Sequence, residues 1–177
     1  MFSSKLKEAL LCLRAGRVTL PYPFVPQAPP EGFRGKPEID GELCVGCGTC
    51  AMVCPPRLIT LADEGEYRVL TVDYTRCTYC ARCEEVCPEG AIKMSNNFET
   101  ATNQKDDLLL QVKMKLARCS RCNRPFATQR LVKKMAQKTI GDQGSGDTVP
   151  AWVSWCPDCR QKYEARILGR LGDVEDD

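Results

Sequence analysis

The apolar positions of the chain predict three helices and a strand around a cysteine-rich middle. In residues 2–18 they recur at the 3.6-residue period of a helix, at Phe2, Leu6, Ala9, Leu10 and Leu13. Residues 128–140 show the same spacing, and residues 160–171 are expected to form a final short helix. Residues 67–72 alternate as a strand does. Residues 141–147 predict a mobile loop and residues 173–177 a frayed end.

A proline-rich segment follows the first helix. Six prolines fall within residues 21–37, and this composition predicts a stiff, extended arm that cannot be helical. A helix on such an arm, with basic side chains beside its apolar side, suits a membrane surface or a groove in a membrane subunit. The alternative is that the helix packs against its own domain, as most amphipathic helices do.

The middle of the chain repeats itself between Ile39 and Met94 at an offset of 33 residues. Each copy contains four cysteines and a proline in the order C-x2-C-x2-C-x3-C-P. Two such copies predict one domain with pseudo-two-fold symmetry, in which neither half buries a core alone.

The composition restricts the chemistry to sulfur ligands. The 177 residues include 13 cysteines and no histidine, which excludes His-dependent catalysis and His-ligated zinc, haem or Rieske sites. No apolar stretch approaches the roughly 18 residues of a membrane helix, and no secretion signal is recognisable. We therefore expect a soluble, cytosolic, metal-loaded protein. No general acid–base pair or phosphate-binding glycine loop stands out, so we expect a carrier that is not an enzyme on its own.

The two cysteine runs have the spacing of bacterial ferredoxins. In that spacing three close cysteines bind one cubane, and the fourth reaches the other cluster. The predicted ligands of the first [4Fe–4S] cluster are Cys44, Cys47, Cys50 and Cys87. Those of the second are Cys77, Cys80, Cys83 and Cys54. Two zinc sites or inert buried thiols are the alternative, which two full copies of the cysteine–proline pattern disfavour.

Four further cysteines predict a separate metal site, and a fifth does not. Two C-x-x-C pairs that meet in space make a tetrahedral sulfur site, which favours zinc over a single rubredoxin-like iron. The predicted ligands are Cys119, Cys122, Cys156 and Cys159. Such a site would stabilise a small module without a redox role. Cys12 has no companion and is interpreted as an ordinary helix residue.

A basic block, which includes the first of these two cysteine pairs, lies between two acidic segments. Residues 108–141 hold nine basic and no acidic side chains, whereas the flanking segments are acidic. The block could bind nucleic acid, dock an acidic subunit or anionic lipid, or be a solvated helix face. Phe126 is its only aromatic residue, so base stacking is poorly supplied and nucleic acid is not expected as a partner.

The order of these pieces resembles the ferredoxin-type iron–sulfur subunit of formate hydrogenlyase and related membrane-bound [NiFe] hydrogenases. That subunit is similar in turn to the two-cluster subunit of respiratory complex I. The resemblance covers nearly the whole chain and rests mainly on residues 119–126 (CSRCNRPF) and 156–161 (CPDCRQ). One departure is Arg57, which stands where the second run has Gly90.

The resemblance implies an α+β fold and a place in an electron-transfer chain. The expected parts are a helix and docking arm (1–38), a two-cluster ferredoxin domain (39–107) and a zinc-ribbon-like four-cysteine module with a basic insert (108–177). The implied partners are a donor iron–sulfur subunit, as in formate dehydrogenase, the small and large [NiFe] hydrogenase subunits, and membrane subunits. The implied location is peripheral, on the cytoplasmic face of the inner membrane. The alternatives are a complex I-like quinone oxidoreductase subunit and a zinc-ribbon nucleic-acid-binding protein.

Overall fold

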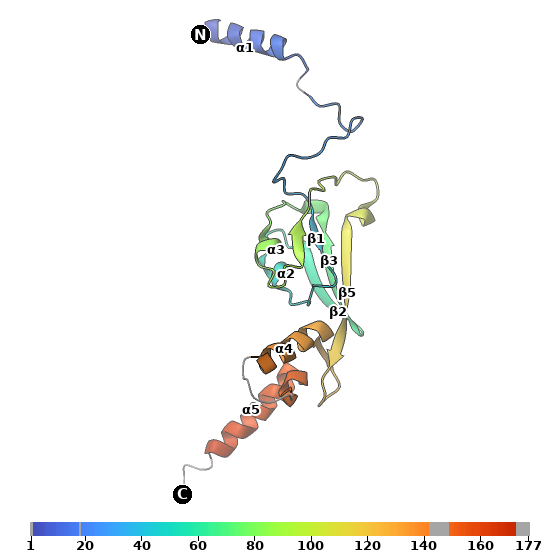
Figure 1. Cartoon of the computed structure of the whole chain (residues 1–177), viewed down its shortest axis with the longest axis vertical. Coiled ribbons are helices and arrows are strands. Elements are labelled where there is room, and N and C mark those ends of the chain that lie inside the picture. Colours follow the sequence, from blue (N-terminus) through green and yellow to red (C-terminus); the bar gives the residue numbers. More distant parts are fainter. Residues whose placement is uncertain (1, 18, 142–148, 173–177) are drawn as a thin grey trace. The chain divides into compact units, whose positions relative to one another are not determined.

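The computed structural model describes residues 2–17, 19–141 and 149–172 (Figure 1). The chain forms two compact units, residues 1–33 and residues 34–177. Residues 142–147 of the expected loop and the expected frayed end lie outside the described residues. Within the described residues, no helix combines the length and the apolar character needed to cross a membrane.

The first unit contains the predicted N-terminal helix. Helix α1 spans Phe2–Ala15, three residues shorter than the predicted 2–18. It ends because Gly16 takes a left-handed conformation (φ 61°) and its N–H bonds the carbonyl of Cys12 at 3.2 Å, a common way to close a helix. The described residues from 19 to 36 form neither helix nor strand, as their prolines predict.

The second unit is built on antiparallel strands. Strands β1 (Pro37–Ile39) and β4 (Ile92–Met94) form a two-stranded sheet, and a four-stranded sheet has the order β2-β3-β5-β6. The four strands are Ile59–Glu64, Tyr67–Asp73, Leu109–Arg118 and Pro125–Thr128. Helices α2 (Thr49–Val53) and α3 (Arg82–Glu85) lie on the side of the strands away from β5 (Figure 1).

The two sequence copies pair their strands in the same register. Ile39 pairs with Ile92 in β1–β4, and the residues 33 positions away, Val72 and Ile59, pair in β2–β3. All four of these residues contribute to one hydrophobic core, in which Met114 of β5 is also buried. The core therefore draws on both copies and on the segment that follows them.

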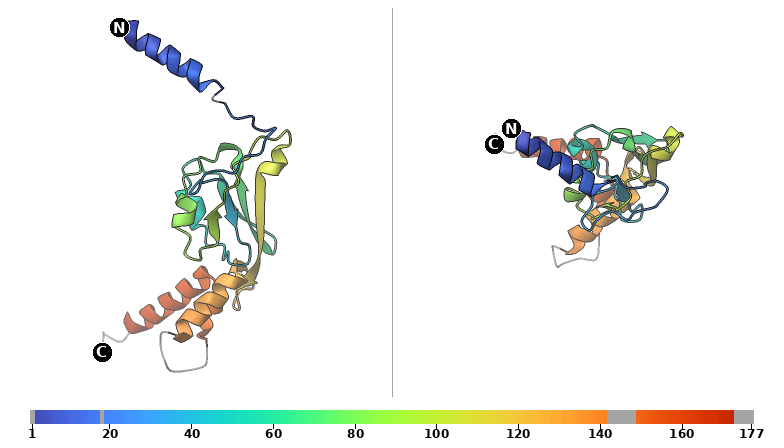
Figure 2. Two further views of the ribbon diagram at one scale, coloured as in Figure 1. Left: turned by 45° about the horizontal axis from the view of Figure 1, so that its top comes forward. Right: turned by 90° about the horizontal axis from the view of Figure 1, so that it is seen from above.

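The C-terminal third is mixed rather than helical throughout. Helices α4 (Gln129–Gly141) and α5 (Pro157–Gly172) confirm the two predicted helices within three residues, and both are seen in Figure 2, in orange and red. Strand β3 confirms the strand predicted at 67–72. Strand β5 was not predicted. It pairs with β3 along Leu109–Lys115 and with β6 from Leu116 onward, so one strand joins the cluster-binding part to the C-terminal part. The described part of the unit also contains three short 3₁₀ helices, at Tyr74–Arg76, Lys105–Leu108 and Ala151–Ser154.

Candidate metal centres

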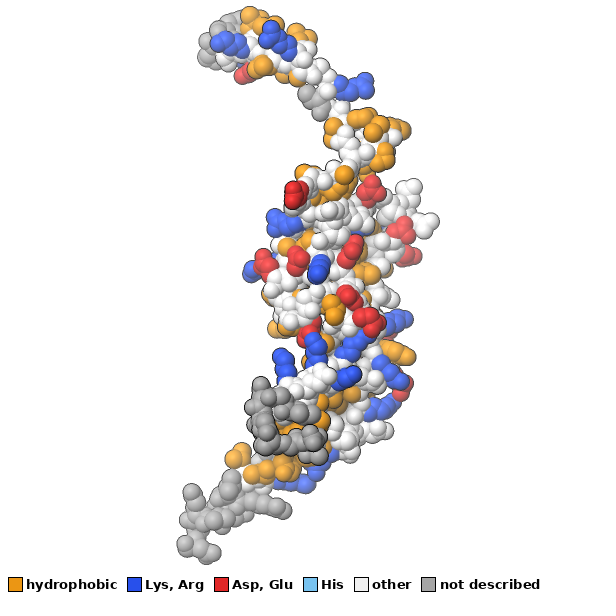
Figure 3. Space-filling model, viewed as in Figure 1, with side chains coloured by type: hydrophobic (Ala, Val, Ile, Leu, Met, Phe, Trp, Pro, Cys, Tyr) orange, Lys and Arg blue, Asp and Glu red, His pale blue; other side chains and the backbone are white. Residues whose placement is uncertain are grey.

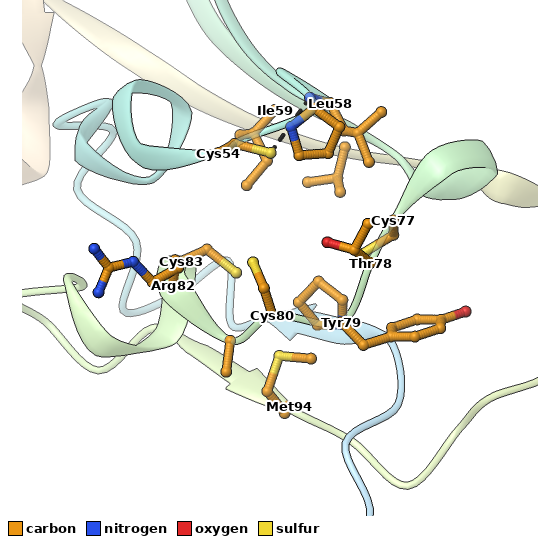
Figure 4. Close-up of a pocket in the computed structure, with 14 residues that line it drawn as sticks. Cys54, Leu58, Ile59, Cys77, Thr78, Tyr79, Cys80, Arg82, Cys83 and Met94 are labelled. Carbon is orange, nitrogen blue, oxygen red and sulfur yellow. Dashed lines mark hydrogen bonds between the residues drawn. The ribbon is translucent and has the colours of Figure 1, made fainter.

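The pocket of the second predicted cluster, called the second pocket below, gathers four of the predicted ligands from both cysteine runs. It is lined by Cys77, Cys80 and Cys83 of the second run and by Cys54 of the first. In Figure 4, Cys54 lies across the pocket from Cys80 and Cys83. The other lining residues are largely apolar, including Leu58, Ile59, Val72 and Met94. The space free of protein atoms in and in front of this pocket, open solvent included, is about 400 Å³.

The pocket of the first predicted cluster, called the first pocket below, gathers the other four ligands. Cys44, Cys47 and Cys50 line it together with Cys87 of the opposite run. The space free of protein atoms in and in front of it, open solvent included, is about 320 Å³. Four thiols around an apolar hollow are the donor set that a [4Fe–4S] cluster requires. The residues therefore fit one cluster in each pocket, and the fourth cysteine of each run lines the pocket of the other run.

Left-handed residues shape both pockets at matching positions. Gly46 (φ 65°) and Gly48 (φ 81°) correspond, 33 residues on, to Tyr79 (φ 50°) and Ala81 (φ 63°). For a residue with a Cβ this conformation costs about 1–2 kcal/mol. The second run thus holds a strained version of the bend that glycine makes without strain in the first.

Arg57, which stands where the second run has Gly90, keeps the left-handed backbone of that glycine, although its side chain makes this conformation strained. Arg57 has φ 52° and its counterpart Gly90 has φ 60°, and each lets the next residue direct its N–H at a cysteine sulfur. The N–H of Leu58 lies 3.4 Å from Cys54 Sγ, and that of Ala91 lies 3.3 Å from Cys87 Sγ. Both runs therefore supply a backbone donor to the sulfur of their fourth cysteine, which stabilises a thiolate.

Burial makes the free thiols of these pockets weak acids. It raises the pKa of Cys50 and of Cys83 to about 11, and it raises the pKa of Cys44 and Cys77 as well. Thiolates in such surroundings need a cation to replace the lost solvation. Cluster iron supplies that cation, so binding of iron and loss of the thiol protons are coupled.

The four C-terminal cysteines also converge. Their sulfur atoms all lie within 4.8 Å of one another. Cys119 and Cys122 belong to the β5–β6 connection, whereas Cys156 and Cys159 lie at the start of α5. A tetrahedral zinc site with bonds of about 2.3 Å places its sulfurs about 3.8 Å apart, and Cys122 Sγ and Cys156 Sγ are 3.6 Å apart. The residues therefore fit a single tetrahedral metal ion.

Hydrogen bonds already polarise this cysteine group. Burial would raise the pKa of Cys119, but the N–H groups of Cys156, Cys122 and Arg121 outweigh it and lower the pKa to about 6. The Cys156 N–H lies 3.2 Å from Cys119 Sγ. Burial and hydrogen bonds to its sulfur neighbours raise the pKa of Cys159 to about 12. The group therefore contains both thiolates and thiols. A metal ion would displace the protons of the remaining thiols.

Much of the basic block is paired within the chain. Figure 3 shows Lys and Arg side chains gathered beside acidic ones on the face drawn. Of the nine basic side chains in residues 108–141, five have an acidic or aromatic partner among the residues that the structure describes. These pairs are Arg118–Glu66, Arg121–Trp155, Arg124–Asp158, Arg130–Glu42 and Lys134–Glu89. The block is therefore in large part a set of internal contacts, which leaves fewer cations for phosphate groups.

Comparison with known proteins agrees with this geometry. The 4Fe-4S dicluster domain family matches residues 43–91, which contain all eight cysteines of the two pockets. Formate hydrogenlyase subunit 6 of Escherichia coli (strain K12) is 37% identical over 154 residues, which cover 85% of each protein. The chain belongs to the formate hydrogenlyase subunit 6 family. The resemblance inferred from the sequence is thereby confirmed.

Relatives of the formate hydrogenlyase subunit 6 family extend to quinone oxidoreductases. NAD(P)H-quinone oxidoreductase subunit I of Prochlorococcus marinus (strain AS9601) is 37% identical over 103 residues, 54% of this chain and half of that protein. A chain of the membrane-bound sulfane sulfur reductase (MBS), an archaeal respiratory membrane complex, is 28% identical with a TM-score of 0.43, covering 57% of this chain and 56% of that one. The family thus consists of iron–sulfur electron-transfer subunits of formate hydrogenlyase or complex I-like complexes.

The sequence did not predict the side chains that hydrogen-bond the backbone of the first pocket. Thr128 is fully buried and donates a hydrogen bond to the Val45 carbonyl at 2.5 Å. Arg130 donates to the carbonyls of Gly41 and Cys44. These contacts join residues more than 80 positions apart, so no local pattern signals them. Tyr74 was missed as well, and its hydroxyl donates to the Pro37 carbonyl at 2.6 Å.

Proposed function

We propose that the chain passes electrons from a donor, such as the iron–sulfur subunit of a formate dehydrogenase, to the small subunit of a [NiFe] hydrogenase. The observation that carries this proposal is the pair of four-cysteine pockets, each completed by a cysteine of the opposite run. When bound, a [4Fe–4S] cluster in each pocket supplies a centre that accepts and releases a single electron. The large hydrogenase subunit would then receive electrons only through the small one.

In this proposal the chain's own residues hold and insulate the two centres. Cys44, Cys47, Cys50 and Cys87 bind one cluster, and Cys77, Cys80, Cys83 and Cys54 bind the other. The apolar lining limits water near the sulfurs, and the N–H groups of Leu58 and Ala91 stabilise negative charge on them. The matching strand registers and left-handed positions support pseudo-two-fold symmetry between the halves.

The C-terminal site has a structural role in this proposal. Cys119, Cys122, Cys156 and Cys159 hold zinc, or less favourably iron, and tie the β5–β6 connection to the start of α5. The functional parts are then the helix and arm (1–38), the two-cluster domain (39–107) and the four-cysteine module (108–177). Strand β5 links the last two parts.

The partners and the location follow from the relatives and from α1. We place the chain peripherally on the cytoplasmic face of the inner membrane, within a complex that includes membrane subunits. Helix α1 supports this placement because Leu6, Leu10 and Leu13 are between 52% and 79% exposed. Lys5, Lys7 and Arg14 accompany them, and apolar and basic side chains together suit an anionic membrane surface or a groove in a membrane subunit.

A second candidate is the equivalent subunit of a quinone-reducing, complex I-like enzyme. The match to NAD(P)H-quinone oxidoreductase subunit I favours it. That match covers 54% of the chain, however, whereas the match to formate hydrogenlyase subunit 6 covers 85%. The four-cysteine module is also more than a two-cluster carrier requires. The hydrogenase complex therefore remains the better proposal.

The decisive experiment is anaerobic purification of the intact complex from membranes in mild detergent, with identification of every chain that co-purifies. Recovery of a [NiFe] hydrogenase pair and membrane subunits supports the proposal, and the donor chain identifies the fuel. A quinone-reducing assembly without a nickel subunit would favour the second candidate. Metal analysis of the same material should give at least about eight iron atoms per copy of this chain, because the partner subunits add iron of their own, and a lower value would refute the cluster assignment itself.

A further inference from the structure

Side chains from beyond the repeat hold the loop that forms the first pocket. Four carbonyl groups of residues 41–46 accept side-chain hydrogen bonds. Arg130 Nη1 donates to Gly41 O and, at 3.3 Å, to Cys44 O. Thr128 Oγ1 donates to Val45 O at 2.5 Å, and Arg68 Nη1 donates to Gly46 O at 3.3 Å. The donors belong to β3, to the end of β6 and to α4.

These hydrogen bonds fix the direction of the loop's N–H groups as well. In a planar trans peptide the N–H of one residue points opposite to the carbonyl of the residue before it. The carbonyls of residues 44–46 point toward these donors. The N–H groups of the residues that follow them, 45–47, therefore point in the opposite direction. The backbone of Gly46 indeed hydrogen-bonds the Cys44 sulfur.

Close packing adds to the hydrogen bonds. A Cβ atom built on Gly46 would lie 2.9 Å from Cγ2 of Thr128, 3.1 Å from Sδ of Met114 and 3.2 Å from Cδ of Arg68. Cys44, Val45 and Gly46 are all buried. Lys134 of α4 forms an ion pair with Glu89, which follows Cys87 by two residues. Both segments that supply cysteines to the first pocket are thus attached to the C-terminal part.

The loop of the second pocket lacks this attachment. Among the described residues, no side chain donates a hydrogen bond to the carbonyls of residues 77–80, and Thr78 and Cys80 are exposed. Arg82 lies beside this pocket, but it is exposed and paired with Glu85 at 3.1 Å. The two pockets therefore have related backbones and different surroundings.

We infer that Thr128 and Arg130 are positioning residues that set the two redox sites at different potentials. By holding the carbonyls of Cys44 and Val45 toward themselves, they keep the N–H groups of Val45 and Gly46 turned toward the sulfurs of the first pocket. Reduction adds negative charge to those sulfurs, and N–H donors stabilise that charge, so the reduction potential there is raised. The C-terminal part is thus a tuning element for one site, an inference that rests on the proposed function.

Redox titration of the anaerobically purified complex, followed by electron paramagnetic resonance, tests this inference. Thr128→Val removes the hydroxyl donor and keeps the volume, whereas Thr128→Ser keeps the donor. Arg130→Gln is a second, independent variant, and Lys138→Gln on the same helix is the control. The Cys80→Ser variant identifies the first-pocket signal as the one that survives.

We expect Thr128→Val and Arg130→Gln each to shift the midpoint potential of the first-pocket signal to more negative values. The second signal should keep its potential, and Thr128→Ser and Lys138→Gln should match the wild type. Unchanged potentials in both variants, or equal shifts of both signals, would overturn the inference. A wild-type protein without two cluster signals would instead overturn the proposed function.

Discussion

Replacing Thr128 with valine should loosen α4 by an amount that the structure allows us to work out. Thr128 precedes the helix, and its hydroxyl has two roles. It accepts the Leu131 N–H at 3.3 Å, as an N-cap residue does, and it donates to the buried Val45 carbonyl. Valine fills the same volume but makes neither hydrogen bond.

The two losses can be estimated separately. Loss of an N-cap hydrogen bond costs about 1 kcal/mol. A buried carbonyl without its partner costs about 1–3 kcal/mol more. The helix should therefore open more easily by at least about 2 kcal/mol, which is about 30-fold in its opening equilibrium.

Hydrogen–deuterium exchange of the iron-loaded complex, read by mass spectrometry, measures this opening in place. Peptides from α4 should exchange about 30-fold faster or more in Thr128→Val, since opening is made easier by about 2 kcal/mol. Thr128→Ser keeps the hydroxyl and should stay near the wild type. Unchanged exchange of α4 in Thr128→Val would refute the reasoning. Equal acceleration in β3 would show that the whole unit opens and that the capping estimate does not apply.

Three further predictions concern the metal sites and α1. Cys87→Ser should abolish the paramagnetic signal of the site formed with Cys44, Cys47 and Cys50, because Cys87 lines that pocket; loss of the other signal would contradict the predicted ligand exchange between runs. Cys156→Ser should remove one equivalent of zinc and unfold the terminal module while the iron content stays unchanged, with Cys12→Ser on the exposed face of α1 as the matched control. If iron is lost together with zinc, the two metal sites are not independent. Deletion of residues 2–20 should shift the protein from the membrane fraction to the soluble fraction, and unchanged fractionation would remove the anchoring role of α1.

The sequence predicted those features that a short stretch of chain determines by itself. Cysteine spacing depends on the shape of one loop, so it pointed to the two groups that the pockets contain. The helices at α1, α4 and α5 follow from local periodicity. Strand β5 also had a local signal, because Leu110, Val112, Met114 and Leu116 alternate with polar side chains.

Other features depend on contacts between distant parts of the chain. The basic block was interpreted as a docking face or a solvated helix face because nothing local shows that Arg130 meets Glu42 or that Lys134 meets Glu89. At position 57 the sequence shows only that arginine stands where the other run has glycine, and it does not reveal the strained backbone of Arg57. Its left-handed backbone shows that the turn is kept despite the side chain.

The position of β5 has a practical consequence for anyone who prepares fragments of this protein. Strand β5 covers one edge of β3 along seven residue pairs. A ferredoxin-sized fragment that stops before residue 109 would leave that edge bare, and its N–H and C=O groups would pair with other chains. Such a fragment should aggregate even with both clusters bound. One that continues through Thr128 keeps the sheet complete and should remain monomeric.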